Sequence, residues 1–235
     1  MTDDFTKDDD LIHIALIPDG NRRYARKLGK PIWHGHYAGA KKIEEFLDWC
    51  LEYDKIKTVS VFALSTENLN RTKEELGHLW KIYKNQLFRS LSSEKIRKRE
   101  IKVNVFGTEN IWREDVRQAA RDTMKLTAQY SRKVINILLS YGSKFEIVNA
   151  IKKIAEKGIK RTRIAEGLLD KYLWVSQPVD LIIRTGDQQR LSNFLLYQSA
   201  YAEIYFSKTM WPEFSKKEFE KIMKWYFKQK RKFGK

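Results

Sequence analysis

Short apolar runs of strand length recur along the chain, and each is too continuous for a strand with one face in water. Longer stretches with apolar residues at helical spacing separate these runs. The alternation predicts an α/β fold in which helices wrap a central six-stranded, mainly parallel sheet. The expected strands are 12–17, 58–64, 102–106, 134–140, 179–183 and 201–206, and the expected helices are 38–52, 73–97, 111–130 and 144–156.

The expected helix 73–97 opens with a capping-box pattern, in which the hydroxyl of Thr72 precedes the carboxylate of Glu75. Its apolar side chains recur at spacings of three and four, which favours packing into the core. A helix with so wide an apolar stripe could also wall a hydrophobic tunnel, and both interpretations stay open. The stripe comprises Leu76, Leu79, Trp80, Tyr83, Leu87, Phe88 and Leu91.

Composition narrows the class of protein. With 235 residues, 42% of them hydrophobic, the chain can bury one large core, and no linker or repeat divides residues 1–235. No apolar run approaches the roughly 20 residues of a membrane span.

Residues 1–10 are acidic and polar, unlike a secretory signal, and we expect them to be flexible. Because Cys50 is the only cysteine, no internal disulfide can form, and we expect a cytoplasmic protein.

The charge balance predicts an anionic partner. Lys and Arg outnumber Asp and Glu by 46 to 30, which gives a net charge of +16. Nucleic acid, a phospholipid surface and phosphorylated small molecules all suit such a field. Many of the cations crowd residues 216–235, a basic C-terminal helix and tail. We interpret these chiefly as a solvated face, with peripheral contact to anionic lipid headgroups as the alternative.

Polar clusters follow three of the expected strands, at 19–23, 65–71 and 184–193. Each mixes cations with small or hydroxylated residues that can donate hydrogen bonds to phosphate oxygens. Since the carboxyl ends of parallel strands share one edge of a sheet, we expect the three clusters to meet there. Taken singly, each has a plain alternative: the arginines are only solvated, Glu67 caps a helix, and Ser192 is a turn hydroxyl.

The motifs of common nucleotide folds are missing from the sequence. No phosphate-binding loop ends in Gly-Lys-Ser or Gly-Lys-Thr, and no three-glycine fingerprint follows the first expected strand. The sequence therefore favours neither ATP hydrolysis nor hydride transfer.

Several motifs spread over nearly the whole chain resemble one family, the cis-prenyltransferases, which include the undecaprenyl and dehydrodolichyl diphosphate synthases. Trans-prenyltransferases, by contrast, are all-helical and carry aspartate-rich motifs within their helices. The three aspartates at 8–10 precede the first expected strand, so they do not match those motifs. The motifs that carry the resemblance are Asp19-Gly20-Asn21, Gly35-His36, Ser65-Thr66-Glu67-Asn68, Arg190-Leu191-Ser192-Asn193-Phe194-Leu195-Leu196-Tyr197-Gln198, Ala200-Tyr201-Ala202-Glu203 and Trp211-Pro212.

The resemblance implies roles for individual residues. Asp19 is expected to be catalytic and to coordinate Mg²⁺ on an allylic diphosphate, and Glu203 to contribute to the metal site. Asn68 is expected to be catalytic by positioning the reacting groups. The expected substrate-binding residues are Gly20, Asn21, Arg22, Arg23 and His36 for the allylic diphosphate, Ser65, Glu67 and Arg71 beside Asn68, and Arg184, Arg190 and Ser192 for isopentenyl diphosphate.

The implied reaction is a Mg²⁺-dependent, Z-selective condensation of isopentenyl diphosphate with an allylic prenyl diphosphate, which yields a polyprenyl diphosphate. The family fold implies a hydrophobic tunnel for the growing chain, and family analogy implies a homodimer without a nucleic-acid partner. The segment between Leu91 and Glu100 is short, which favours a short or medium product.

The sequence also departs from the family pattern. Asp187-Gln188 stands where members usually have Gly-Glu, and Ile32 stands where several bacterial members have an arginine. One interpretation is neutral drift in a working enzyme. Another is an altered homoallylic site that couples two allylic diphosphates, as the lavandulyl diphosphate synthases do. A third hypothesis is a non-catalytic partner subunit or basic binding protein, against which the retained motif residues argue.

Overall fold

The central sheet has six strands, and every neighbouring pair runs parallel. The computed structural model describes residues 11–163 and 165–229, so the expected flexibility of residues 1–10 and the end of the basic tail lie outside it. All six expected strands are present, and the sheet is parallel throughout the described chain rather than mainly so. In sheet order the strands are β3 (Ile101–Phe106), β4 (Lys133–Tyr141), β2 (Ile56–Ser65), β1 (Ile12–Ile17), β5 (Leu181–Arg184) and β6 (Glu203–Phe206).

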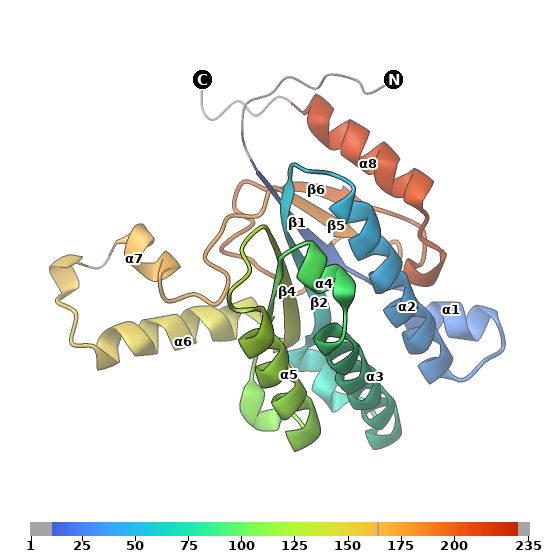
Figure 1. Ribbon diagram of the computed structural model, residues 1–235, viewed down its shortest axis with the longest axis horizontal. Coiled ribbons are helices and arrows are strands. Elements are labelled where there is room, and N and C mark those ends of the chain that lie inside the picture. The colour runs from blue at the N-terminus through green and yellow to red at the C-terminus, as the bar shows by residue number, and fades with distance from the viewer. Residues whose placement is uncertain (1–10, 164, 230–235) are drawn as a thin grey trace.

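Both faces of the sheet are covered, as a parallel sheet requires (Figure 1). On one face, Phe46 and Phe219 pack against the strands, and the neighbouring α3 and α5 close a second cluster. On the other face, the loops around Val175 and Phe194 cover Ala15, Phe62 and Leu138. The helices are α1 (Asn21–Lys27), α2 (Ile32–Leu51), α3 (Lys73–Leu91), α4 (Glu94–Lys98), α5 (Glu114–Thr127), α6 (Ser143–Glu156), α7 (Glu166–Asp170) and α8 (Lys216–Lys228).

Two helices differ from expectation for local reasons. Helix α2 begins at Ile32, six residues earlier than predicted. The sequence pattern misses its first turns because glycines, rather than apolar side chains, face the neighbouring α1 there. A Cβ on Gly35 would lie 1.9 Å from the Asn21 carbonyl oxygen, so only glycine permits this approach. The single helix predicted over 73–97 is broken, since Ser92 ends α3 and the hydroxyl of Ser93 caps α4 by accepting from the Ile96 N–H.

The basic helix α8 is confirmed for residues 216–228. Phe219, Ile222 and Met223 are fully buried against the sheet, while the lysines of its outer face are exposed. No helix within residues 11–163 and 165–229 is both long and apolar enough to cross a membrane.

Candidate active site

The turn after β1 holds a carboxylate at the carboxyl edge of the sheet. Gly20 has a φ of 109°, and a Cβ there would lie 2.9 Å from the Met210 Cα, so both conformation and space require glycine. The Asp19 Oδ1 atom accepts from the Gly20 N–H at 2.6 Å and from Arg23 at 3.3 Å. The Asp19 carbonyl oxygen accepts from the Thr185 hydroxyl at 2.8 Å. These contacts fix the carboxylate at the end of β1.

Arg184 brings the third polar cluster, residues 184–193, to the carboxyl end of β1 beside Asp19. It ends β5 beside Ile17 of β1, and its guanidinium donates to Asp19 Oδ2 at 2.9 Å. The same guanidinium donates to the Ser192 hydroxyl at 2.9 Å and to the Arg190 carbonyl oxygen. Burial is the main reason that the pKa of Arg184 is lowered, but an arginine keeps its charge at any physiological pH. A buried cation is thus held beside Asp19.

A second charged group surrounds Glu75, whose side chain is only 7% exposed. Its Oε1 atom lies 2.8 Å from His36 Nε2, 3.1 Å from Arg71 Nη1 and 3.6 Å from Arg22 Nε. Arg71 also donates to Asn68 Oδ1 at 2.7 Å. Burial is the main reason that the pKa of His36 is lowered, so its ring is neutral at pH 7. A neutral ring that donates Nε2–H to Glu75 leaves Nδ1 as an acceptor.

Glu75 is a candidate site residue that sequence reasoning missed. The capping-box prediction is confirmed for its backbone, since the Thr72 hydroxyl accepts from the Glu75 N–H at 3.2 Å. The carboxylate, however, turns away from the helix end toward His36 and Arg71. The available signal was the spacing of four residues from Arg71, which favours an ion pair.

The other residues of the second and third clusters range from buried to exposed. The hydroxyl of the buried Ser65 accepts from the Asn68 N–H at 3.2 Å, and the exposed Glu67 accepts from Asn193 at 3.3 Å. Burial tends to raise the pKa of Glu67, but hydrogen bonds to its carboxylate outweigh it and lower the pKa. The Arg190 guanidinium donates to Gln188 at 2.6 Å, so the departure from the family pattern touches an expected substrate-binding residue.

Glu203 is not brought beside Asp19 within this chain. It is the first residue of β6 and pairs with Leu181, whereas Arg184 at the Asp19 end pairs with Phe206. The described residues contain no group of three or more His, Cys, Asp or Glu that could hold a metal ion. Magnesium is commonly held by one or two carboxylates together with substrate phosphates and waters. Asp19, which is 32% exposed and faces a cavity, fits that mode of binding.

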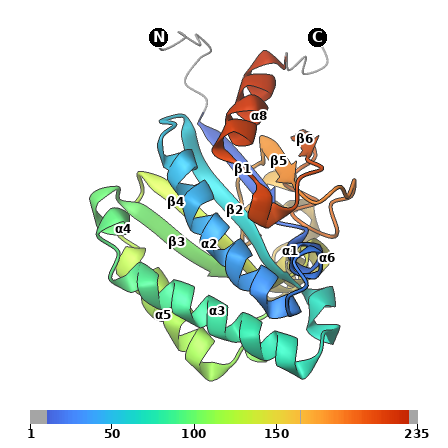
Figure 2. The ribbon, with the colours of Figure 1, turned by 90° about the vertical axis from the view of Figure 1, so that its right-hand side faces the viewer.

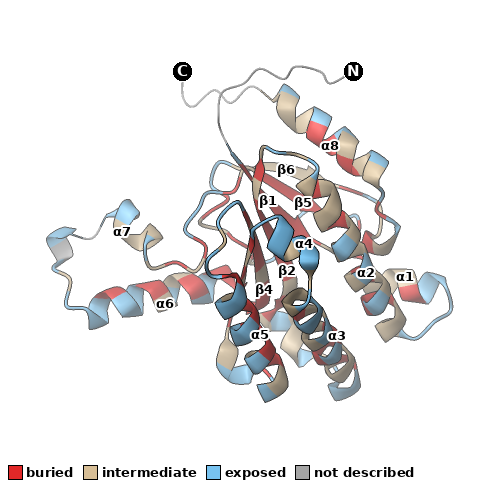
Figure 3. Cartoon of the chain, in the orientation of Figure 1, coloured by how far each residue is buried: buried red, intermediate tan, exposed pale blue. Residues whose placement is uncertain are grey.

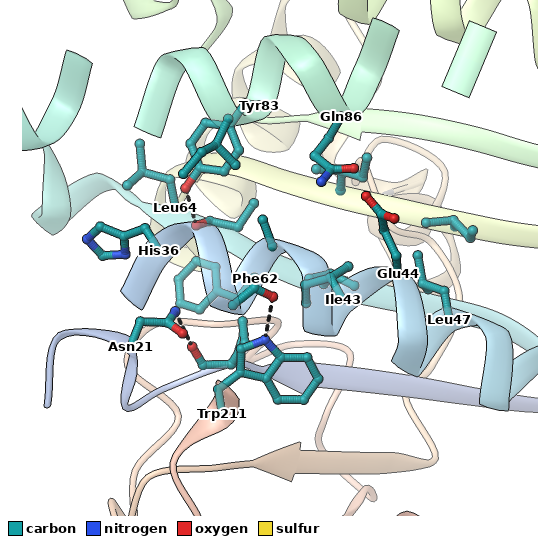
Figure 4. Close-up of a pocket in the computed structure, with 18 of the residues that line it drawn as sticks. Asn21, His36, Ile43, Glu44, Leu47, Phe62, Leu64, Tyr83, Gln86 and Trp211 are labelled. Carbon is teal, nitrogen blue, oxygen red and sulfur yellow. Dashed lines mark hydrogen bonds between the residues drawn. The ribbon is translucent and has the colours of Figure 1, made fainter. Parts of the chain in front are cut away.

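A cavity of about 750 Å³ begins at this charged edge and continues between α2, α3 and the sheet (Figure 4). Near its mouth, the Tyr83 hydroxyl donates to the Ala63 carbonyl oxygen at 2.6 Å, and burial raises the pKa of Tyr83. Arg23, Glu67 and Glu203 are outside its described lining, while the other eleven predicted site residues line it. These eleven are Asp19, Gly20, Asn21, Arg22, His36, Ser65, Asn68, Arg71, Arg184, Arg190 and Ser192, of which Asp19 is a predicted metal ligand.

Comparison with known proteins agrees with this geometry. A family model described as "Putative undecaprenyl diphosphate synthase" matches residues 17–234. The chain belongs to the cis-prenyltransferase family. Among curated cis-prenyltransferases, the tritrans,polycis-undecaprenyl-diphosphate synthase (geranylgeranyl-diphosphate specific) of Thermococcus kodakarensis is 42% identical over 228 residues, which cover 94% of this chain and 86% of the relative. The namesake from Pyrobaculum aerophilum is 38% identical and covers 94% and 95%.

Two solved cis-prenyltransferase structures share the fold. The lavandulyl diphosphate synthase of Lavandula x intermedia, in complex with dimethylallyl diphosphate, matches with a TM-score of 0.89 and 29% identity over 96% of this chain and 99% of that one. A "probable undecaprenyl diphosphate synthase" from Campylobacter jejuni matches with a TM-score of 0.80 and 33% identity over 97% and 100%. The recognised family and the α/β fold predicted from the sequence are thus confirmed.

Proposed function

We propose that this cis-prenyltransferase condenses isopentenyl diphosphate with an allylic prenyl diphosphate, with Mg²⁺ and Z selectivity, to give a polyprenyl diphosphate. The observation that carries the proposal is the Asp19–Arg184 pair, at 2.9 Å, at the mouth of a 750 Å³ cavity with apolar walls. Cations at the mouth suit two diphosphates, and the apolar walls suit a growing hydrocarbon. The cavity would then serve as the prenyl tunnel.

The two diphosphates would occupy different parts of the mouth. Gly20, Asn21 and Arg22 follow Asp19 at the start of α1 and would hold the allylic diphosphate. Arg184, Arg190 and Ser192 would hold isopentenyl diphosphate. Support comes from the Nε atoms of Arg22 and Arg184, which are buried and have no hydrogen-bond partner among the described residues. Buried donors of this kind are stabilised when an anion accepts from them.

Asp19 would hold the metal ion, which neutralises the departing diphosphate when it is bound. The chain's own residues would do the remaining work. As the allylic C–O bond breaks and the new C–C bond forms, the arginines would stabilise the leaving charge before a proton is lost from the former isopentenyl unit. Asn68, oriented by Arg71, would position the reacting groups. Apolar walls around Leu64 would exclude water that could quench cationic carbon.

The test is an assay with labelled isopentenyl diphosphate and a set of allylic primers. Geranylgeranyl diphosphate is the first primer to try, because the Thermococcus relative is named as specific for it. Nuclear magnetic resonance of the product would establish the new double bond as Z. Absence of extended product with every primer would refute the proposal.

Coupling of two allylic diphosphates is a second candidate function. It is favoured by Gln188, which replaces a family carboxylate and accepts from Arg190, and by the match to a lavandulyl diphosphate synthase. Dimethylallyl diphosphate supplied without isopentenyl diphosphate would yield a branched product only under this alternative. A non-catalytic partner subunit would give no product in either assay.

We also propose a homodimer formed through α6. This helix extends away from the sheet and is largely exposed (Figure 3), and its apolar residues Phe145, Val148 and Ile151 are 45%, 50% and 54% exposed. Such a stripe suits burial against a second copy. Light scattering would give the mass of a dimer for the wild type and of a monomer for Val148→Glu combined with Ile151→Glu.

Peripheral membrane contact in the cytoplasm remains a proposal as well. Its support is the exposed lysine face of α8, formed by Lys217, Lys221 and Lys224. Co-sedimentation with vesicles that contain phosphatidylserine tests it, since replacement of the three lysines by glutamine should abolish binding.

A further inference from the structure

Helices α2 and α3 lie side by side (Figure 2), and residues of both helices line the cavity. Two kinds of contact join α2 to its neighbours. Near the charged mouth, Trp33 of α2 stacks on His78 of α3 with ring centroids 5.0 Å apart. Farther along α2, two ion pairs join this helix to α3 and α4. Glu44 lies 2.9 Å from Arg89 of α3, and the next pair joins α2 to Lys95 of α4.

The second pair exists because α3 stops where it does. Ser92 and Ser93 break the helix, and the chain then re-enters helix as α4, beside the start of β3. That change of direction brings Lys95 to 2.5 Å from Asp48 of α2. A single helix through this region, as the sequence pattern predicts, would not supply this contact.

Both ion pairs lie away from the Asp19 end of the cavity. The mouth end of α2 is fixed at Gly39, where a Cβ would lie 2.3 Å from Asn21 Oδ1. Glu44 and Asp48 follow Gly39 by five and nine residues, or about 7 Å and about 13 Å at the helical rise. Figure 4 shows the same arrangement, with Asn21 at one end of the cavity and the Glu44 carboxylate at the other.

Between the Asp19 end of the cavity and the ion pairs, the walls are apolar. Ile43 and Leu47 of α2 face Leu79 and Ile82 of α3 across the cavity. All four members of the ion pairs line the cavity, yet their side chains are 46% to 72% exposed. They are therefore hydrated, and a hydrocarbon pushed against them would strip water from charged groups, which is unfavourable.

We propose that the Glu44–Arg89 and Asp48–Lys95 ion pairs form a charged rim that limits how long a prenyl chain this enzyme makes. The inference rests on the proposed function, because it takes the growing hydrocarbon to fill the cavity from the Asp19 end. Extension continues while each added unit meets apolar wall, and it slows when the chain end reaches the rim. Exposed ion pairs contribute little to stability, so the rim can be altered without loss of the fold.

The test compares product lengths from labelled isopentenyl diphosphate and geranylgeranyl diphosphate. Glu44→Leu with Arg89→Leu makes one pair apolar, and Asp48→Leu with Lys95→Leu does the same for the other. Glu44→Arg with Arg89→Glu exchanges the charges but keeps a pair. The matched control is Glu94→Leu with Lys98→Leu, which removes a 2.9 Å ion pair on α4 outside the described cavity lining.

Each apolar double variant should lengthen the most abundant product by one isoprene unit or more. The charge-exchange variant and the control should keep the wild-type length. Unchanged length in both apolar variants, or equal lengthening in the charge-exchange variant, would overturn the inference while leaving the proposed function intact. If the wild type extends no primer, the proposed function fails, and the rim has no product to limit.

Discussion

The Nη2 atom of Arg184 lies 2.9 Å from the Oδ2 atom of Asp19, across the neighbouring strands β5 and β1. The two residues are 165 positions apart, and parallel pairing of Ile17 with Arg184 brings them together. The arginine is buried while the carboxylate is partly exposed to the cavity. The pair therefore joins two clusters that the sequence presents separately.

Arg184→Lys should reduce kcat/KM for isopentenyl diphosphate by about tenfold to a hundredfold. Lysine keeps the charge but cannot donate in the planar fork that reaches Asp19, Ser192 and the Arg190 carbonyl oxygen at once. One lost charge-assisted hydrogen bond corresponds to about 1.5 to 3 kcal/mol. Steady-state kinetics with varied isopentenyl diphosphate measures the effect. Values within twofold of the wild type would show that the fork is dispensable.

Glu75→Gln should lower kcat/KM by about tenfold or more, because the neutral amide no longer balances Arg71 and Arg22 or orients His36. Thr72→Ala is the matched control, since it removes the helix cap but leaves the carboxylate. The control should cost about 1 kcal/mol of stability and leave kinetics nearly unchanged. If both variants instead lose activity in proportion to their loss of stability, Glu75 contributes only by stabilising helix α3.

The sequence predicts the local part of this architecture well. The strand that ends at Ile17, the glycine turn after it and the cap at Thr72 each depend on neighbouring residues alone. The carboxylate of Glu75 was missed because its partner His36 lies 39 residues earlier and meets it only after folding.

The start of α2 and the end of α3 were missed for different physical reasons. Gly35 and Gly39 pack closely against Asn21, so the contact face of α2 lacks the apolar pattern that marks a helix. The break after α3 follows from two serines, which suit helix caps but also occur within helices. Likewise, the position of Glu203 depends on the register of β6, which no local pattern specifies.

Stability should fall as the pH is lowered from 6.5 toward 4, in part because of His13. Burial is the main reason that the pKa of His13 is lowered from 6.5 to about 4, and its Nε2 lies 2.7 Å from the Ser60 hydroxyl. Below pH 6.5 the unfolded chain binds a proton that the folded chain excludes. The loss amounts to about 3 kcal/mol by pH 4.

Urea unfolding across this pH range, compared between the wild type and His13→Gln, isolates that contribution. The variant should be less stable at pH 7 but should lose less stability on acidification. Equal pH slopes for the two proteins would assign the acid sensitivity to other groups.

Glu146→Ala should lower the free energy of unfolding by at least about 2 kcal/mol, since a buried carboxylate with three donors is removed. It accepts from the Val175 N–H at 3.0 Å, from Gln198 at 3.2 Å and from the Tyr141 hydroxyl. Glu156→Ala, at the exposed end of the same helix, should change stability by less than about 0.5 kcal/mol. Denaturant titrations that give equal losses for both variants would contradict this role.

The central claim is that Asp19, held by Arg184, organises the transfer of an allylic prenyl group to isopentenyl diphosphate. The most direct measurement is a single-turnover assay with Mg²⁺, labelled geranylgeranyl diphosphate, one equivalent of isopentenyl diphosphate and excess enzyme, comparing the wild type with Asp19→Asn. Asp122→Asn is the matched control, because Asp122 is exposed on α5 and outside the described cavity lining. We predict one-unit elongation by the wild type and the control, and a rate at least about a hundredfold lower for Asp19→Asn. Elongation at the wild-type rate by Asp19→Asn would contradict the account.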